Sequence, residues 1–116
     1  MSKKIMAVIL AYNCQNEINK TLKKIQKYEK YFHKICVIDN NSKDKTFIKA
    51  NTFIKNNNLK KFEIIKNLKN FGQGGSHKVA FEYTLKNKCD YCLVYHGDDQ
   101  ANIEYFKKIF LNKLYN

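Results

Sequence analysis

A run of apolar residues, Tyr91 to Tyr95, leads directly into the polar sequence His96-Gly97-Asp98-Asp99-Gln100. A run this short, rich in aromatic and branched residues, predicts a strand buried on both faces. Such strands occur in mostly parallel sheets covered by helices. Ligands of these sheets bind beyond the carboxyl ends of the strands, where adjacent carboxylates suit a divalent metal held against phosphate. The alternative is a polar turn that only solvates the end of a central strand.

Strand and helix patterns alternate along the chain. Strands are predicted at Ile5 to Ala11, at Ile35 to Ile38, at Phe62 to Ile65 and from Tyr91. Helices are predicted between them, the first capped by Asn13 or Asn16 and ending near Tyr31. A fourth helix after Gln100 would carry Ile103, Phe106, Phe110 and Leu114 on its apolar face. This order predicts an α/β fold, a doubly wound mostly parallel sheet with helices on both faces, formed by residues 1–116 as one domain.

The net charge of +12 comes from lysines alone, because the chain contains no arginine. Proteins that read nucleic-acid sequences usually depend on the arginine fork, so we expect no nucleic-acid partner. The lysine excess predicts a solvated helix surface, part of which attracts phosphorylated ligands or an anionic membrane leaflet. No apolar run reaches the length of a membrane span, so we expect a cytoplasmic protein, with the inner face of the membrane as an open alternative.

The cysteines and two of the histidines predict no separate metal site. Cys89 and Cys92 form one C-x-x-C pair without the second pair that a zinc site needs. We interpret the cysteines as buried thiols, except Cys14, which lies in the first strand-to-helix turn and is expected to be accessible. His33 and His77 are expected to be surface or packing residues.

Polar clusters follow all four predicted strands. They are Tyr12-Asn13, Asp39, the loop from Asn70 to Gly74, and Asp98-Asp99. If the sheet is parallel, these clusters meet at one edge. An aromatic ring can stack on a nucleobase, an aspartate can accept hydrogen bonds from a base or ribose, and backbone amides before a helix can approach phosphate.

Four successive segments resemble the motifs of family 2 glycosyltransferases, in the family's order and spacing. These segments are Val8-Ile9-Leu10-Ala11-Tyr12-Asn13, Val37 to Thr46, Asn70-Phe71-Gly72-Gln73-Gly74-Gly75-Ser76 and Tyr95-His96-Gly97-Asp98-Asp99-Gln100. The resemblance implies the GT-A fold and the transfer of a sugar from a nucleotide-diphosphate sugar, with a UDP-sugar favoured. It also implies a divalent cofactor, Mn²⁺ or Mg²⁺.

The resemblance also implies roles for single residues. Tyr12 matches a tyrosine near the nucleobase, and Asp39 matches an aspartate that binds base or ribose. The implied nucleotide-sugar-binding residues are Tyr12, Asn13, Asp39, Asn70, Gly72, Gly74, Lys78 and Asp98. The implied metal residues are Asp98, Asp99 and His96. His96 stands where the family usually has an aspartate, and it is either a metal ligand or an outer hydrogen-bond partner. Imidazole suits manganese or a softer metal better than magnesium.

The chain is shorter than members of this family. We therefore expect that the acceptor site and the general base lie in a C-terminal half that the chain lacks, and that the catalytic residue is not among these 116. The expected acceptor is a saccharide or a lipid-linked sugar of bacterial surface polysaccharide or glycolipid synthesis. A homodimer or a partner subunit would cover the flank left open. Two other functions remain open, a non-catalytic nucleotide-sugar-binding or regulatory module, and a basic protein that binds nucleic acid or a membrane surface.

Overall fold

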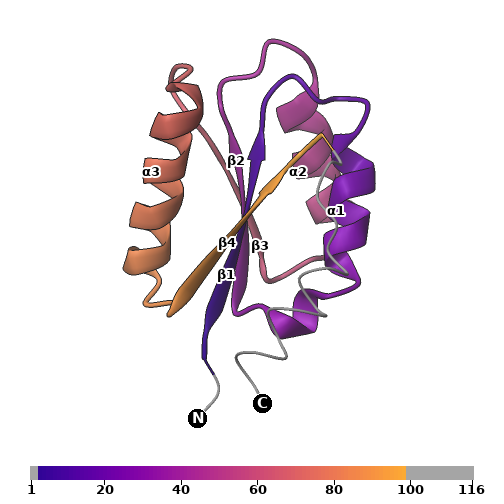
Figure 1. Cartoon of the computed structure of the whole chain (residues 1–116). Helices are drawn as coiled ribbons and strands as arrows, with labels where there is room; N and C mark the ends of the chain where they lie inside the picture. Colours follow the sequence, from indigo (N-terminus) through magenta and orange to yellow (C-terminus); the bar gives the residue numbers. More distant parts are fainter. Residues whose placement is uncertain (1–2, 99–116) are drawn as a thin grey trace.

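The computed structural model describes residues 3–98, which form one parallel sheet with helices on both faces (Figure 1). The strands are β1 (Ile5–Ala11), β2 (Lys34–Asp39), β3 (Phe62–Lys66) and β4 (Tyr91–His96). They lie in the order β3-β2-β1-β4. The helices are α1 (Ile18–Gln26), a short 3₁₀ helix (Glu29–Tyr31), α2 (Thr46–Asn56) and α3 (Gly72–Lys86). The predicted doubly wound α/β fold is confirmed.

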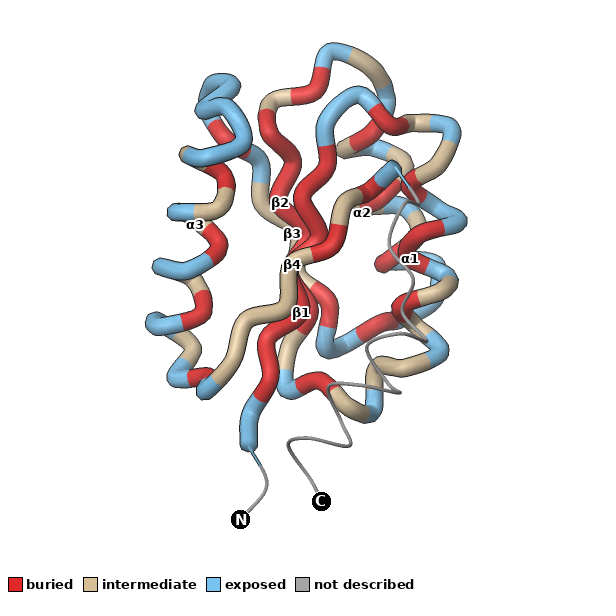
Figure 2. Tube along the Cα trace, in the orientation of Figure 1, coloured by how far each residue is buried: buried red, intermediate tan, exposed pale blue. Residues whose placement is uncertain are grey.

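Strand β1 lies at the centre of the sheet because all seven of its residues are apolar and buried. Its alternate side chains enter different cores. Ile5, Ala7 and Ile9 pack in the core beneath α1 and α2, whereas Met6 and Val8 pack in the core that α3 covers. Figure 2 shows this buried strand between the two helical layers. Continuous apolar character thus marks a strand with helices on both faces.

The order of the strands creates a switch point between β1 and β4. From β1 the chain passes to β2 and then to β3, with α1 and α2 on one face of the sheet (Figure 1). It then returns through α3 on the opposite face and places β4 on the other side of β1. The connections on the two sides of β1 thus cover opposite faces of the sheet, and such a switch point is where open α/β sheets bind ligands, beyond the carboxyl ends of the strands.

Two predictions about the elements were wrong in detail. Strand β4 is not central in the described part of the chain, because it pairs there with β1 alone and most of its residues are half-buried. The first helix begins at Ile18. Its N-cap position is Glu17, which makes no side-chain capping bond, so neither Asn13 nor Asn16 caps the helix.

The helix predicted after Gln100 lies outside the described residues. Between residues 3 and 98, no helix is long and apolar enough to cross a membrane.

Candidate functional site

A cleft of about 320 Å³ opens at the carboxyl edge of the sheet, next to the switch point. The strand register brings the ends of β1, β2 and β4 to this edge, because Ala11 pairs with Asp39 and Leu10 pairs with His96. The cleft lies among the loops after the strands and the first turn of α3. Its lining residues include Tyr12, Cys14, Asn40, Asn70, Gly72, Gln73, Ser76, His96, Gly97 and Asp98.

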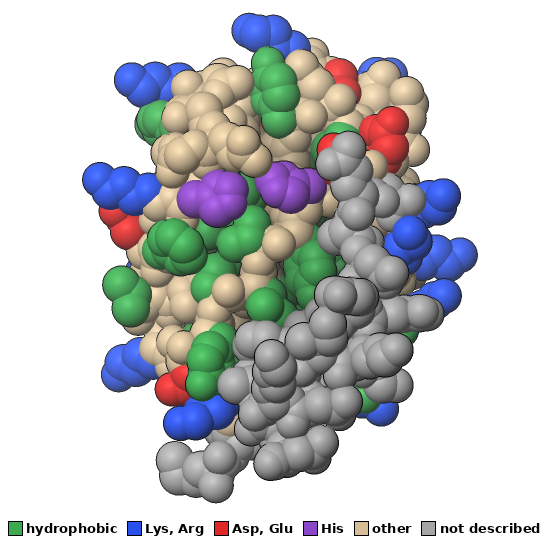
Figure 3. Space-filling view, viewed as in Figure 1, with side chains coloured by type: hydrophobic (Ala, Val, Ile, Leu, Met, Phe, Trp, Pro, Cys, Tyr) green, Lys and Arg blue, Asp and Glu red, His purple; other side chains and the backbone are tan. Residues whose placement is uncertain are grey.

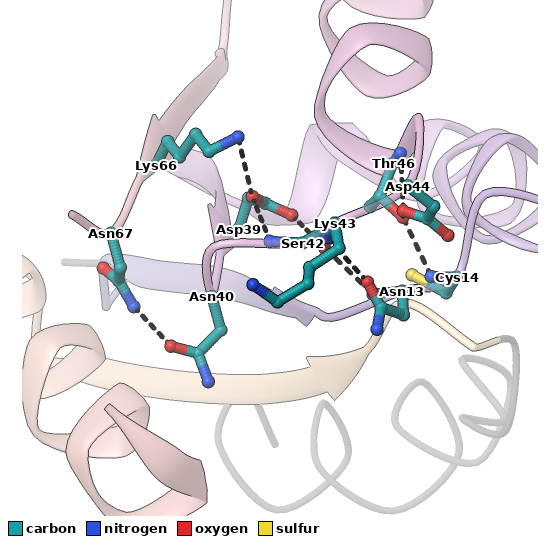
Figure 4. A network of polar contacts seen from close by, with 10 residues as sticks. All are labelled: Asn13, Cys14, Asp39, Asn40, Ser42, Lys43, Asp44, Thr46, Lys66 and Asn67. Atoms are coloured by element: carbon teal, nitrogen blue, oxygen red, sulfur yellow. Dashed lines mark hydrogen bonds and ion pairs between the residues drawn. The ribbon is translucent and has the colours of Figure 1, made fainter. Parts of the chain in front are cut away.

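The loop after β1 is tied to the loop after β2 and to the start of α2 by hydrogen bonds from main-chain N–H groups to side-chain oxygens (Figure 4). The Asn13 N–H donates to Ser42 Oγ at 2.9 Å, and the Lys43 N–H donates to Asn13 Oδ1 at 2.9 Å. The Cys14 N–H donates to Thr46 Oγ1 at 2.8 Å. These contacts position Tyr12, a residue that is 45% exposed, in the loop at the cleft.

Asp39 organises the loop after β2 from a buried position. Ser42 donates to both carboxylate oxygens, from its N–H to Oδ2 at 3.0 Å and from its hydroxyl to Oδ1 at 2.5 Å. The ammonium of Lys66 lies 4.0 Å from Oδ2. Asp39 therefore has a structural role at the base of the loop, and it is not among the residues that line the cleft.

Asp44 fixes the start of α2 in the same loop. Its Oδ1 accepts hydrogen bonds from the N–H of Thr46 at 3.0 Å and from the Thr46 hydroxyl. Its Oδ2 accepts one from the N–H of Gln15 at 3.2 Å. Burial opposes ionisation of this carboxyl, but these hydrogen bonds outweigh it and hold the pKa of Asp44 below its ordinary value. The contact is therefore present at neutral pH and would be lost only in acid.

Asn40 connects the loop after β2 with the loop that precedes α3. Its Oδ1 accepts from Asn67 Nδ2 and from the Phe71 N–H, both at 3.0 Å, and its Nδ2 donates to Asn70 Oδ1 at 2.9 Å. Sequence reasoning did not select Asn40 as a site residue. The signal available was its place between Asp39 and Ser42, because asparagine in such runs bonds to nearby backbone.

The first turn of α3 brings main-chain N–H groups and a buried hydroxyl to the cleft. Gly72 has a φ of +73°, a value that favours glycine, and its N–H donates to Asn70 Oδ1 at 2.7 Å. Ser76 lines the cleft and is only 2% exposed. Its hydroxyl has no hydrogen-bond partner in the described part of the chain. A buried polar atom without a partner is costly, so a ligand atom at this end of the cleft would satisfy it.

Strand β4 ends in a turn that is fixed by two hydrogen bonds. The Gly97 N–H donates to Leu10 O at 2.9 Å, and Thr21 of α1 donates through Oγ1 to Gly97 O at 3.0 Å. His96 and the exposed Asp98 on either side of Gly97 both line the cleft. An imidazole nitrogen and a carboxylate oxygen are suitable ligands for a divalent ion. Residues 3–98 contain no cluster of three or more metal-binding side chains.

The structure brings together some of the predicted site residues but not all. Five of them line one cleft, namely Tyr12, Asn70, Gly72, His96 and Asp98. Four others lie close to the cleft without lining it, in the loop after β1, at the end of β2 or on α3, namely Asn13, Asp39, Gly74 and Lys78. Asp99 lies outside the described residues.

Cys14 is not the accessible thiol that the sequence predicted. It is 3% exposed, and burial raises the pKa of its thiol to about 11, although hydrogen bonds with Tyr12 and Thr46 act in the opposite direction. At neutral pH this cysteine is a protonated, apolar part of the cleft floor.

Comparison with a protein-family model identifies the family of this chain. The family model described as "Glycosyl transferase family 2" matches residues 6–113. Among solved structures, the mannosyltransferase PcManGT from Pyrobaculum calidifontis, in complex with GDP-Man and Mn²⁺, matches with a TM-score of 0.62 and 16% sequence identity. The match covers 72% of this chain and 25% of the mannosyltransferase chain. At this identity the likeness shows the fold, and the chain spans about a quarter of that protein. No curated protein matches the chain significantly.

Proposed function

Because this chain belongs to glycosyl transferase family 2, we propose that its cleft binds the nucleotide-diphosphate sugar of a glycosyltransferase. In this proposal residues 1–116 form a single nucleotide-sugar-binding domain. The observation that carries it is the position of the cleft, at the switch point between β1 and β4, with conformationally fixed polar loops around it.

The surroundings of the cleft suit the parts of such a ligand. The exposed side chain of Tyr12 offers a surface on which a base can stack, and Asn13 in the same loop would take up the base or ribose. Asp39, whose carboxylate is buried and bonded to Ser42, would contribute by holding the loop after β2 in place. Main-chain N–H groups at the start of α3 favour the diphosphate, with Asn70, Gly72 and Gly74 in or beside this turn. Lys78 extends from the exposed side of α3 and would add a positive charge.

We further propose that the site uses a divalent ion, Mn²⁺ or Mg²⁺. The solved mannosyltransferase is in complex with Mn²⁺. In this chain Asp98, Asp99 and His96 would hold the ion, and the two described members, His96 and Asp98, line the same cleft. When bound, such an ion supplies positive charge that stabilises the departing diphosphate.

The proposed reaction transfers the sugar to a saccharide or lipid-linked acceptor, in the synthesis of bacterial surface polysaccharide or glycolipid. Inverting transfer requires a base that deprotonates the acceptor hydroxyl. We expect that base, and the acceptor site, outside the described residues. A UDP-sugar is the favoured donor, although the mannosyltransferase complex contains GDP-Man. The nucleotide is therefore a matter for experiment.

Thermal unfolding in the presence of UDP, GDP or dTDP tests this function. With Mn²⁺ and a nucleotide at about a hundred times its Kd, we expect the melting temperature to rise by roughly 10 °C, because the ligand binds the folded chain alone. Asp98→Asn should abolish most of the metal-dependent increase in melting temperature. Glu82→Gln, which removes an exposed carboxylate on α3, is the matched control and should retain it.

The controls separate donor binding from the other two functions. If all nucleotides leave the melting temperature unchanged, the proposal is wrong. A rise in melting temperature that does not depend on the metal and disappears at high salt would instead indicate a basic surface that binds phosphate without specificity. Stabilisation without sugar transfer or donor hydrolysis by the longest available form of the protein would favour a non-catalytic binding module.

A further inference from the structure

The outer side of α3, which faces away from the sheet, carries large apolar side chains. Phe81 and Leu85 are 53% and 75% exposed. The fully buried residues of α3 are smaller and mostly polar, namely Ser76, Ala80 and Thr84. Val79 and Tyr83 are half-buried against the core. A surface helix usually has its larger apolar residues toward the core and polar residues toward solvent. The reversed arrangement indicates that the outer side of α3 contacts a partner.

The apolar surface continues into the loop before α3. Phe71, directly before the helix, is 40% exposed and lies against Gly75, where an added Cβ would be 2.6 Å from Phe71 Cβ. Leu68 is 96% exposed. The loop is anchored on both sides of this leucine, because Asn40 Oδ1 accepts hydrogen bonds from Asn67 Nδ2 and from the Phe71 N–H. Four of the six large apolar side chains that are exposed within residues 3–98 thus belong to α3 or to the loop before it.

The exposed apolar side chains of α3 share one face of the helix. Residues seven positions apart differ by only about 20° around a helix of 3.6 residues per turn. Phe71, Lys78 and Leu85 therefore form one line along α3. Phe81 lies beside this line, one turn before Leu85. We refer to these four residues as the α3 outer surface.

Lysines surround the α3 outer surface. Residues 64–89 contain five lysines and a single acidic residue, Glu82. The lysines, all of them exposed, are Lys66, Lys69, Lys78, Lys86 and Lys88. The ammonium of Lys69 lies 5.8 Å from the centroid of the Phe71 ring, so positive charge and apolar surface are in contact at the start of the helix. Figure 3 shows apolar and lysine side chains interspersed along the margin that α3 occupies.

We propose that the α3 outer surface binds a membrane leaflet that contains anionic phospholipids. A helix at such an interface places phenylalanine and leucine at the boundary of the acyl chains and lysine among the headgroups. Each lysine near an anionic leaflet strengthens binding through attraction to the lipid phosphates. A second copy of the chain fits less well, because it would bring the same lysines face to face. An apolar protein groove would take Lys78, in the middle of the apolar line, out of water without offering it an opposite charge.

Binding in this orientation would bring the cleft close to the membrane surface. The first turns of α3, where the apolar line begins, contribute Gly72, Gln73 and Ser76 to the cleft lining. An acceptor anchored in the same leaflet would then approach the cleft from the side of α3. Only this consequence rests on the proposed function, because the contact between α3 and lipid requires no ligand in the cleft.

Co-sedimentation of the full chain with phospholipid vesicles tests this contact. We expect binding to mixed phosphatidylcholine and phosphatidylglycerol vesicles that is at least about tenfold stronger than binding to phosphatidylcholine alone. Phe81→Gln and Leu85→Gln should each weaken the binding about fivefold to tenfold, because glutamine removes the apolar contact and keeps the helix propensity. Ile48→Gln is the matched control and should retain full binding, since Ile48 is 63% exposed on α2, on the opposite face of the sheet (Figure 1).

A tryptophan reporter identifies the side of the molecule that enters the lipid, because the chain contains no tryptophan. On the anionic vesicles the fluorescence emission of Leu85→Trp should move to shorter wavelength, whereas that of Ile48→Trp should stay unchanged. Circular dichroism of each variant establishes that the substituted chain is folded.

Absence of binding to the anionic vesicles would overturn the proposal, and so would binding that Phe81→Gln and Leu85→Gln leave unchanged. Self-association in sedimentation velocity that is lost in these two variants, without any vesicle binding, would also overturn it and assign the α3 outer surface to a second copy of the chain. Stabilisation by nucleotide is measured without vesicles, so it decides the proposed function separately.

Discussion

Gly97→Ala is expected to lower the free energy of unfolding by about 1 to 3 kcal/mol, the usual cost of adding a methyl group to a packed interior. A Cβ at this position would lie 3.0 Å from Cys14 Sγ, 3.0 Å from Ile18 Cδ1 and 3.2 Å from Ala11 Cβ. All three neighbours are buried, so they have little room to move. The substitution would also displace the turn that holds Asp98 at the cleft. Thermal or urea unfolding measures the loss, which should appear as a decrease in melting temperature of roughly 5 to 15 °C.

Gly74→Ala provides the matched control for this substitution. It adds the same methyl group, but apart from the neighbouring residues and the backbone of its own helix no atom lies within 4 Å of the Cβ it would create. Gly74 lies inside α3, where alanine is the better helix former, so stability should stay unchanged or rise by about 0.5 kcal/mol. Equal stabilities of the Gly97 and Gly74 variants would contradict the close packing described at the end of β4.

Asn40→Ala is expected to destabilise the chain by about 2 to 3 kcal/mol and to weaken nucleotide binding as well. The side chain makes three hydrogen bonds, to Asn67, Phe71 and Asn70. Both Asn40 and Asn67 are buried, so the amide of Asn67 would lose its partner away from water. The loop before α3 would then keep only the backbone bond from the Asn67 N–H to Asp39 O, and the first turn of α3 would be held less firmly at the cleft. Urea unfolding and nucleotide titration measure the two effects separately.

Asn57→Ala is the control, because it removes the same type of side chain at an exposed position away from the cleft. Asn57 is exposed and bonds locally, from Nδ2 to Phe53 O at 2.8 Å. Its loss should cost no more than about 0.5 kcal/mol, because water replaces the bond, and nucleotide affinity should be unchanged. If Asn40→Ala behaves like Asn57→Ala in both measurements, the link between the two loops is not what holds the cleft.

The fold could be predicted from the sequence because each element carries its own pattern. The unbroken apolar run of β1 marks a strand covered on both faces, and the polar residues that follow it mark the carboxyl edge. The same pattern gave a wrong prediction of burial for β4. Tyr91 to Tyr95 is as apolar as a central strand, yet four of its residues are half-buried in the described sheet. An apolar composition indicates that a strand can be buried, but its actual burial depends on the strands and helices that pack against it.

The candidate site could be predicted only in part, because the roles of several of its residues depend on contacts between segments that are distant in the sequence. Tyr12 and Asp98 follow strands directly, and their residue types already suggest a ligand. Asn40 and Ser76 are of common residue types, and only the structure shows what they do. Asn40 makes three hydrogen bonds between two loops, and Ser76 brings a buried hydroxyl without a partner among the described residues to the cleft. His77, expected to be a surface or packing residue, is half-buried and its ring packs near that of His96.

Mapping of nucleotide binding by amide chemical shifts tests the central claim most directly. The ¹⁵N-labelled chain is titrated with UDP and with GDP, each in the presence of Mg²⁺. Binding in the cleft predicts that the largest shifts fall on residues at the carboxyl edge, namely Tyr12, Asn40, Gly72, Ser76 and Gly97. Residues at the amino edge, among them Lys4 and His33, should keep their positions. Shifts that cluster at the amino edge or spread over the exposed lysines, or the absence of shifts at saturating nucleotide, would contradict a nucleotide-sugar site at the switch point.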